Sequence, residues 1–278
     1  MSLRIAHISD LHFFSLPKTI KGFLGLNGLG VLNHALFRRK FFHSHLFEDL
    51  LHEILLQNID EVWISGDLTV SGLEEEFIEA KNELKKLFDS NLKIRVIPGN
   101  HDLRSNGKKT FSSLFQQDTG HELVETISLN THWDLITIDA SHNEKKRDSG
   151  AFTEEIEALL ITHLKNSTKS QVAILCHYPP PIAEGKQNRL VRGRALEEVL
   201  LNHSKVALFA HGHTHRQTLF QLSGTVVANP GISRGTYGRY NLYQLQETSV
   251  KAELRRIKSR HESQNWINEQ VFHKELES

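Results

Sequence analysis

Apolar and polar positions follow two alternating patterns up to residue 215. Short apolar runs typical of buried strands are separated by stretches in which apolar residues recur every three or four positions, as on one face of a helix. Helices are therefore predicted near 46–56, 73–88, 153–164 and 195–202. The runs predict strands at Leu3–Ser9, Glu61–Ser65, Lys93–Ile97, Trp133–Asp139, Gln171–Cys176 and Val206–Ala210.

After residue 215 the pattern changes to short apolar runs separated by Gly and Pro, which predicts strands near 217–222, 225–228, 240–246 and 250–256. Alternating strands and helices followed by short strands predict an α/β domain in which sheet packs on sheet and helices lie outside. We expect one domain over residues 1–258. The polar and charged stretch 259–278 predicts a surface helix or a tail.

Residues 13–45 form an insertion between the first strand and its helix, longer than the 2–6 residues usual there. From Leu11 to Phe47 there is no acidic residue, and seven of the 15 phenylalanines fall in this range. One interpretation is a lid that packs its aromatic rings on the domain. The other is a surface that contacts anionic lipid, with basic groups at the headgroups.

Charge and composition restrict the class of protein. Lys plus Arg equals Asp plus Glu at 33 each, which disfavours a surface built to bind nucleic acid. There is no apolar run of about 18 residues and no apolar N-terminal stretch, so we expect neither a membrane span nor export. The single cysteine, Cys176, fits a reducing compartment. These features predict a cytoplasmic protein, and lipid contact by 13–45 would place it at the inner face of the membrane.

Side chains that can bind metal ions follow the predicted strands directly. They are Asp10, His12, Asp67, Asn100, His101, Asp102, His177, His213 and His215. Carboxylate, imidazole and amide oxygen ligands suit divalent cations, and ligands of α/β sheets bind at the carboxyl ends of strands. On an extended chain, residues two apart point to the same side, so Asp10 with His12, and His213 with His215, can reach one ion. Each cluster is weak alone, but five in order predict a polynuclear metal site.

Three other residues beside these clusters are assigned supporting or packing roles. His7 is expected to be a core or supporting histidine. His211 either orients a metal ligand or ends its strand with a hydrogen bond, and the second interpretation is favoured slightly. Cys176 is expected to point into the core.

The order D-x-H, G-D, G-N-H-D, H and G-H-x-H resembles the signature of the calcineurin-like metallophosphoesterases over about residues 3–247. The resemblance implies two mixed β-sheets packed as a sandwich flanked by helices, and two divalent metal ions (Mn, Fe, Zn or Co). It also implies that one ion is held by Asp10, His12 and His215, the other by Asn100, His177 and His213, with Asp67 bridging both. His-Tyr-Pro-Pro-Pro after Cys176 and Asn229-Pro230-Gly231 are similar to the bacterial cyclic-nucleotide phosphodiesterase branch.

Such a site predicts hydrolysis of a phosphate ester. Two cations about 4 Å apart lower the pKa of a shared water, so that a bridging hydroxide attacks phosphorus in line with the leaving oxygen. The resemblance makes His101 the donor of a proton to that oxygen. Asp102 either orients this imidazole or stabilises the turn, and the two interpretations are equally supported.

The expected substrate is a small phosphodiester or a cyclic nucleotide. Four arginines near the predicted mouth, Arg104, Arg189, Arg192 and Arg194, are candidates for binding substrate phosphate. If 13–45 contacts lipid, a pyrophosphatase acting on a lipid-linked nucleotide sugar such as UDP-diacylglucosamine becomes attractive. A nuclease is the third alternative, and zero net charge disfavours it, so no nucleic-acid partner is expected. If the chain were a non-catalytic binding module, some metal ligands should have been replaced, whereas every motif position is intact.

Overall fold

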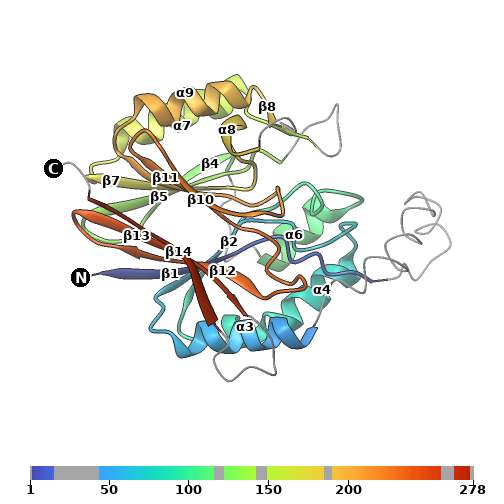
Figure 1. Ribbon diagram of the computed structural model, residues 1–278. Coiled ribbons are helices and arrows are strands. Elements are labelled where there is room, and N and C mark those ends of the chain that lie inside the picture. Colours follow the sequence, from blue (N-terminus) through green and yellow to red (C-terminus); the bar gives the residue numbers. More distant parts are fainter. Residues whose placement is uncertain are drawn as a thin grey trace.

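The computed structural model describes residues 2–15, 44–115, 122–141, 149–184, 190–257 and 266–275. Two six-stranded sheets lie face to face, and helices cover their outer faces (Figure 1). Most of the insertion predicted at 13–45 lies outside the described residues, so the lid and the lipid-contact interpretations both stay predictions.

The first sheet contains the N-terminal strand at its centre. Its order is β14 (Trp266–Glu275), β13 (Ser249–Ile257), β12 (Arg239–Leu245), β1 (Leu3–Ile8), β2 (Glu61–Ile64) and β3 (Lys93–Val96). β1, β2 and β3 are parallel, whereas β12, β13 and β14 pair antiparallel. The carboxyl ends of β1, β2 and β3 therefore meet at one edge of this sheet.

The second sheet is also mixed. Its order is β10 (Gln217–Leu222), β11 (Thr225–Pro230), β9 (Val206–Ala210), β7 (Gln171–Cys176), β5 (Trp133–Ile138) and β4 (Val124–Ser128). The four central strands are parallel, and β10 and β4 pair antiparallel at the edges. A small parallel pair, β6 (Gly150–Ala151) with β8 (Leu190–Val191), lies apart from both sheets.

Helices α3 (Ser44–Leu56), α4 (Glu74–Glu83), α5 (Lys85–Phe88) and α6 (Gly107–Phe115) lie on the side of the first sheet. Helices α7 (Glu154–Asn166), α8 (Pro181–Glu184) and α9 (Gly193–Asn202) lie on the side of the second. As predicted, Thr153 caps α7, because its hydroxyl accepts a hydrogen bond from the Ile156 amide.

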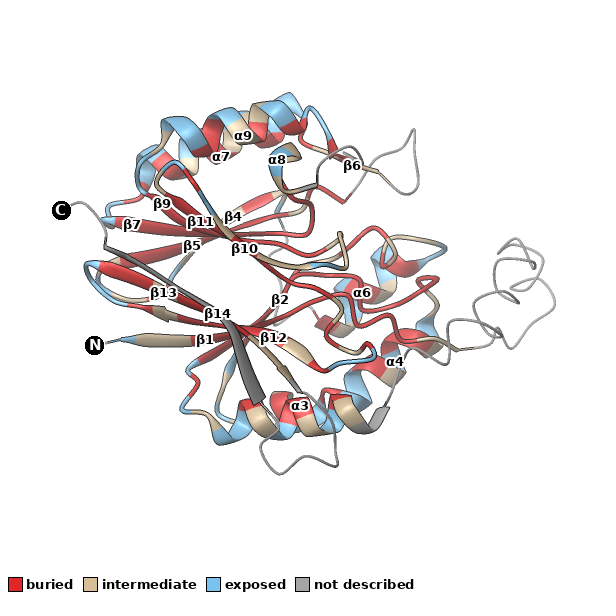
Figure 2. Cartoon of the chain, in the orientation of Figure 1, coloured by how far each residue is buried: buried red, intermediate tan, exposed pale blue. Residues whose placement is uncertain are grey.

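Apolar side chains form three layers, one under each group of helices and one between the sheets. The central layer contains Trp63, Trp133 and Tyr243, all fully buried. Figure 2 shows buried residues along both sheets and along the inward faces of the helices. The predicted sandwich of two mixed sheets flanked by helices is thus confirmed.

The prediction for residues 259–278 was wrong where the structure describes them. Trp266–Glu275 forms strand β14, which pairs antiparallel with β13. A strand at the edge of a sheet is held by backbone hydrogen bonds on one side, so a polar sequence is compatible with it. The polar composition therefore suggested a surface helix or tail where the backbone forms a strand.

Candidate metal centre

The structure gathers all seven predicted metal ligands at the edge where the two sheets meet. Each follows a strand directly, and the loops after β1, β2 and β3 supply four of them from the first sheet. The loops after β7 and β9 supply the other three from the second sheet. The first sheet contributes Asp10, His12, Asp67 and Asn100, and the second contributes His177, His213 and His215.

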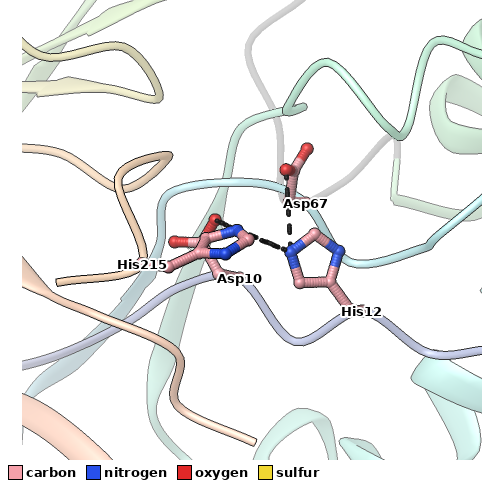
Figure 3. Close-up of side chains that lie close together, drawn as sticks. All are labelled: Asp10, His12, Asp67 and His215. Carbon is pink, nitrogen blue, oxygen red and sulfur yellow. Dashed lines mark hydrogen bonds and ion pairs between the residues drawn. The ribbon is translucent and has the colours of Figure 1, made fainter. Parts of the chain in front are cut away.

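The first group of ligand atoms comes from Asp10, His12, Asp67 and His215, which point toward one another (Figure 3). One ligand atom from each lies within 4.8 Å of all the others. The Nε2 atoms of His12 and His215 are 3.0 Å apart, and His215 Nε2 lies 3.3 Å from Asp10 Oδ1.

The second group is formed by Asn100, His177 and His213. Asn100 Oδ1 lies 3.2 Å from His177 Nε2 and 3.2 Å from His213 Nδ1. Asp67 joins the two groups, because its Oδ2 atom is 3.9 Å from His12 Nε2 and 3.5 Å from His177 Nε2. The family resemblance implied the same two groups, and which side chains hold which ion stays a prediction.

The chemistry of these donors fits divalent cations. Asp10 Oδ1 and Asp67 Oδ2 are buried and make no hydrogen bond among the described residues, although burial of an unsatisfied carboxylate oxygen is costly. Two ligands at right angles on a cation with bonds of about 2.1 Å lie about 3 Å apart, close to the separation of the His12 and His215 nitrogens. The residues present therefore fit a metal-binding role.

The remaining polar atoms of these ligands are held by backbone groups. His177 Nδ1–H donates to Ser65 O at 2.7 Å, and His12 Nδ1 lies 3.3 Å from Thr69 O, so Nε2 of each ring is the nitrogen that can bind a metal, which on His177 would replace a proton. Asp67 Oδ1 accepts a hydrogen bond from the His101 amide at 2.9 Å, which orients Oδ2 between the two groups.

Five of the seven predicted ligands have left-handed backbone conformation, with φ of 55° at Asp10, 47° at His12, 53° at Asp67, 70° at His213 and 59° at His215. Non-glycine residues rarely adopt it, and such strain concentrates at functional sites. The sequence reasoning assumed an extended chain. That assumption was wrong, and the side chains converge because the chain turns tightly at each ligand.

Charge at the centre favours cations. Burial would raise the pKa of Asp67, but neighbouring His177 and His101 hold it well below its ordinary value, and Asp10 beside His215 has a pKa of about 2 despite its burial. Burial lowers the pKa of His12 to about 3, which keeps its ring neutral and able to bind a metal. Burial opposes charge on His177 as well, yet Asp67 raises its pKa to about 9.

His101 borders the first ligand group, with its ring centroid 4.9 Å from that of His12. Its Nδ1 lies 2.6 Å from Val70 O and is occupied on that side of the ring, so Nε2 is the nitrogen suited to proton transfer. Arg104 Nη1 lies 2.9 Å from the same Nδ1 and donates to Val70 O at 3.1 Å. Arg104 therefore stabilises the position of the Val70 carbonyl that contacts His101.

Asp102 stabilises the loops rather than the His101 ring. Its carboxylate accepts hydrogen bonds from the amides of Leu68, Thr69 and Gly99 and from the Thr69 hydroxyl, at 2.8 to 3.1 Å. Burial and the nearby Asp67 raise its pKa to about 6. Of the two interpretations of Asp102, these contacts match the turn-stabilising one.

The other predicted substrate arginines lie elsewhere or outside the described residues. Arg192 donates to Glu157 at 2.7 Å and lies 3.9 Å from Glu154, so carboxylates of α7 balance its charge. Arg194 is exposed on α9. Arg189 lies outside the described residues, and its role stays a prediction.

Asn229 supports the centre, and the sequence reasoning gave it no role. Its Nδ2 donates to Gly212 O at 2.7 Å and to Thr214 Oγ1 at 2.9 Å, and its Oδ1 accepts from the Gly231 amide. It therefore fixes the loop that carries His213 and His215. The Asn-Pro-Gly motif was the signal that pointed to it.

The histidines expected to support the centre are both buried. His7 Nε2 lies 2.8 Å from Ser65 Oγ and its Nδ1 lies 2.7 Å from Tyr243 Oη, so it links β1 to the residue whose carbonyl holds His177. His211 Nδ1 lies 3.0 Å from Gly212 O, which matches a histidine that ends its strand with a hydrogen bond.

Fold, ligand set and charge together define a metal-dependent phosphoester hydrolase. The chain belongs to the calcineurin-like phosphoesterase family, whose model matches residues 3–217. A probable cyclic nucleotide phosphodiesterase of Vesicomyosocius okutanii is 29% identical over 208 residues, covering 70% of this chain and 83% of the relative. A probable glycerophosphodiester phosphodiesterase, GpdQ, of Arcobacter nitrofigilis is 28% identical over 221 residues, covering 76% and 71%.

Solved structures agree on the fold. The crystal structure of a dimetal phosphatase from Danio rerio superposes with a TM-score of 0.72 at 13% identity, covering 99% of both chains. Among the described residues, no helix is both long and apolar enough to span a bilayer.

Proposed function

We propose that this chain hydrolyses a small phosphodiester or a cyclic nucleotide at a centre that holds two divalent cations. The proposal rests mainly on Asp67, whose Oδ2 atom faces His12 Nε2 at 3.9 Å and His177 Nε2 at 3.5 Å. One carboxylate oxygen between two ligand groups is the arrangement that a bridged metal pair requires. The names of the two relatives above support a diester substrate.

Three ligands would hold each cation, with Asp67 shared between them. Asp10, His12 and His215 would hold one ion, and Asn100, His177 and His213 would hold the other. When bound, such ions supply positive charge for the phosphate oxygens and lower the pKa of water at the site.

His101 is the proton donor to the leaving oxygen in this proposal. The Val70 carbonyl fixes Nδ1, which directs the opposite nitrogen for transfer. Arg104 limits movement of the Val70 carbonyl and of the ring at the same time.

Hydrolysis of bis-p-nitrophenyl phosphate by the purified protein with added Mn²⁺ tests the proposal. We expect Asn100→Ala and His177→Ala each to lower kcat/KM by roughly 100-fold or more, since each removes a ligand. His203→Ala is the control, because His203 lies at the end of α9 and contacts the Val199 carbonyl. Rates near the wild type in both ligand variants would overturn the assignment.

A substrate panel then separates the diester proposal from its alternatives. We expect faster hydrolysis of cyclic nucleotides or glycerophosphodiesters than of simple monoesters. Preference for a nucleotide-sugar lipid would favour the pyrophosphatase alternative, and preference for DNA or RNA would favour the nuclease. Faster hydrolysis of monoesters than of every diester would contradict the proposal.

A further inference from the structure

Two arginines lie directly opposite each other on neighbouring strands of the first sheet. Arg239 begins β12 and pairs in register with Arg256 on β13. Like charges opposite each other on neighbouring strands repel. An anion bound between the two guanidinium groups would be attracted by both.

Both side chains lie on the face of the first sheet that faces the second. Residues separated by an even number of positions share a face of a strand. Arg239 is four residues before Tyr243, and Arg256 is two residues after Leu254, and both apolar residues belong to the layer between the sheets. Arg255 lies on the opposite face and pairs with α3 through Glu53.

The loop before Arg239 is tied to the first metal-binding turn. The Ser233 amide donates to Ser9 O at 3.0 Å, and the Ser9 amide donates to Ser233 Oγ at 3.0 Å. The Arg239 amide lies 3.4 Å from Ser233 O. Ser9 directly precedes the ligand Asp10. Arg239 is therefore connected to the metal-binding turn through Ser233.

The second sheet meets the arginines from the other side. Gln217, two residues after His215, donates from Nε2 to the Arg255 carbonyl at 3.2 Å. That contact joins the start of β10 to the part of β13 that carries Arg256. The arginine pair therefore lies close in the fold to loops that supply ligands from both sheets.

Tyr237 holds the two guanidinium groups together. Its ring centroid is 5.4 Å from the guanidinium carbon of Arg239 and 5.4 Å from that of Arg256, and its side chain is 40% exposed. Arg239 Nε is buried and makes no hydrogen bond within the described part of the chain.

We propose that Arg239 and Arg256 bind a second phosphoryl group of the substrate while the scissile phosphate lies at the metal centre. Guanidinium groups match phosphate oxygens with paired N–H donors, which suits this geometry. This inference rests on the proposed function and narrows its substrate class to compounds with two phosphoryl groups. They are diesters that carry a separate phosphate, whereas the pyrophosphatase alternative would require the two phosphoryl groups to be joined directly.

Calorimetry with three nucleotides tests the inference on the Mn²⁺-loaded full chain. Thymidine 5′-monophosphate has one phosphoryl group. Thymidine 3′,5′-bisphosphate has two separate phosphates, and thymidine 5′-diphosphate has two that are joined as a pyrophosphate. We expect at least one of the latter two to bind roughly tenfold more tightly than the monophosphate. Arg239→Gln and Arg256→Gln should reduce that ratio to about twofold or less, and Arg239→Lys should retain part of it.

Lys251→Gln is the matched control, because it removes one positive charge from β13 without touching the arginine pair, and it should keep the wild-type ratio. Whichever of the two-phosphate nucleotides binds more tightly shows whether the site prefers separate or joined phosphoryl groups. An equal affinity for all three nucleotides in the wild type, or a ratio that persists in Arg239→Gln, overturns the inference. None of the three nucleotides contains a phosphodiester bond, so failure of diester hydrolysis is a separate result.

Discussion

At the scale of single residues, the centre depends on backbone conformation as much as on ligand type. Each left-handed, non-glycine ligand costs roughly 1 kcal/mol of backbone strain, and five of the seven ligands carry it. Hydrogen bonds around the ligands must compensate for that cost. Asp102 and Asn229 supply several of these bonds to the loops, so residues that touch no metal determine where the ligands point.

Asp67→Asn tests the bridging role with little change of shape. Asn tolerates a left-handed backbone and keeps an oxygen for the His101 amide, but it removes the charge at Oδ2. We expect metal content to fall from two ions towards one, and kcat/KM to fall by roughly 100-fold or more. Elemental analysis of the purified protein measures the metal content. Asp60→Asn serves as the control, and two tightly bound ions in Asp67→Asn would contradict the bridge.

Arg104→Met tests whether Arg104 positions His101. Without the contact to Val70 O, the His101 ring loses one restraint, so proton donation to the leaving oxygen should weaken. A p-nitrophenolate leaves readily without a proton, whereas an alkoxide does not. We therefore expect a loss of roughly tenfold or more in kcat with an alkyl diester and a much smaller loss with bis-p-nitrophenyl phosphate. Equal losses on both substrates would indicate a general structural defect instead.

At the scale of elements, strand positions and the order of ligands were predictable, because each ligand follows an apolar run that forms a core strand. Contacts between distant elements were not. Asp102 binds Thr69 and Gly99, and Arg192 is neutralised by Glu157, and neither pairing leaves a local pattern in the sequence. β14 was missed for a different reason: its partner β13 directly precedes it in the chain, but its own sequence is largely polar.

The start of α4 gives a pH-dependent contribution to stability. Glu76 is fully buried and accepts hydrogen bonds from the amides of Ser71 and Leu73, yet burial raises its pKa to about 7 from an ordinary 4.5. The folded state therefore binds this proton more tightly than the unfolded state. Its contribution to stability is complete below about pH 4.5 and is lost as the pH rises through about 7.

Glu76→Gln should remove that dependence, because Gln does not titrate and can keep one oxygen acceptor. The free energy of unfolding of the wild type should fall by up to about 3 kcal/mol more than that of the variant between pH 4.5 and pH 7.5. Urea unfolding at a series of pH values measures the difference. Parallel curves for the two proteins would show that Glu76 keeps an ordinary pKa.

At the scale of the whole molecule, the metal ligands are divided between the two sheets. Cations bound there connect the sheets, and they bind the folded state in preference to the unfolded one. We expect Mn²⁺ at about 100 times its dissociation constant to add roughly 3 kcal/mol to the free energy of unfolding. Thermal unfolding with Mn²⁺ and with EDTA measures this, and Asp67→Asn should show a smaller shift. An unchanged midpoint in the wild type would argue against metal binding at this centre.

The position of β1 has a consequence for how the chain matures during synthesis. Leu3 of β1 pairs with Leu245 of β12, so β1 is synthesised long before the strand that completes its pairing on that side. The loops that bear Asp10 and His12 can become rigid only after β12 has been translated. Catalytic competence therefore arises late, and incomplete chains that end before β12 should remain inert toward phosphate esters.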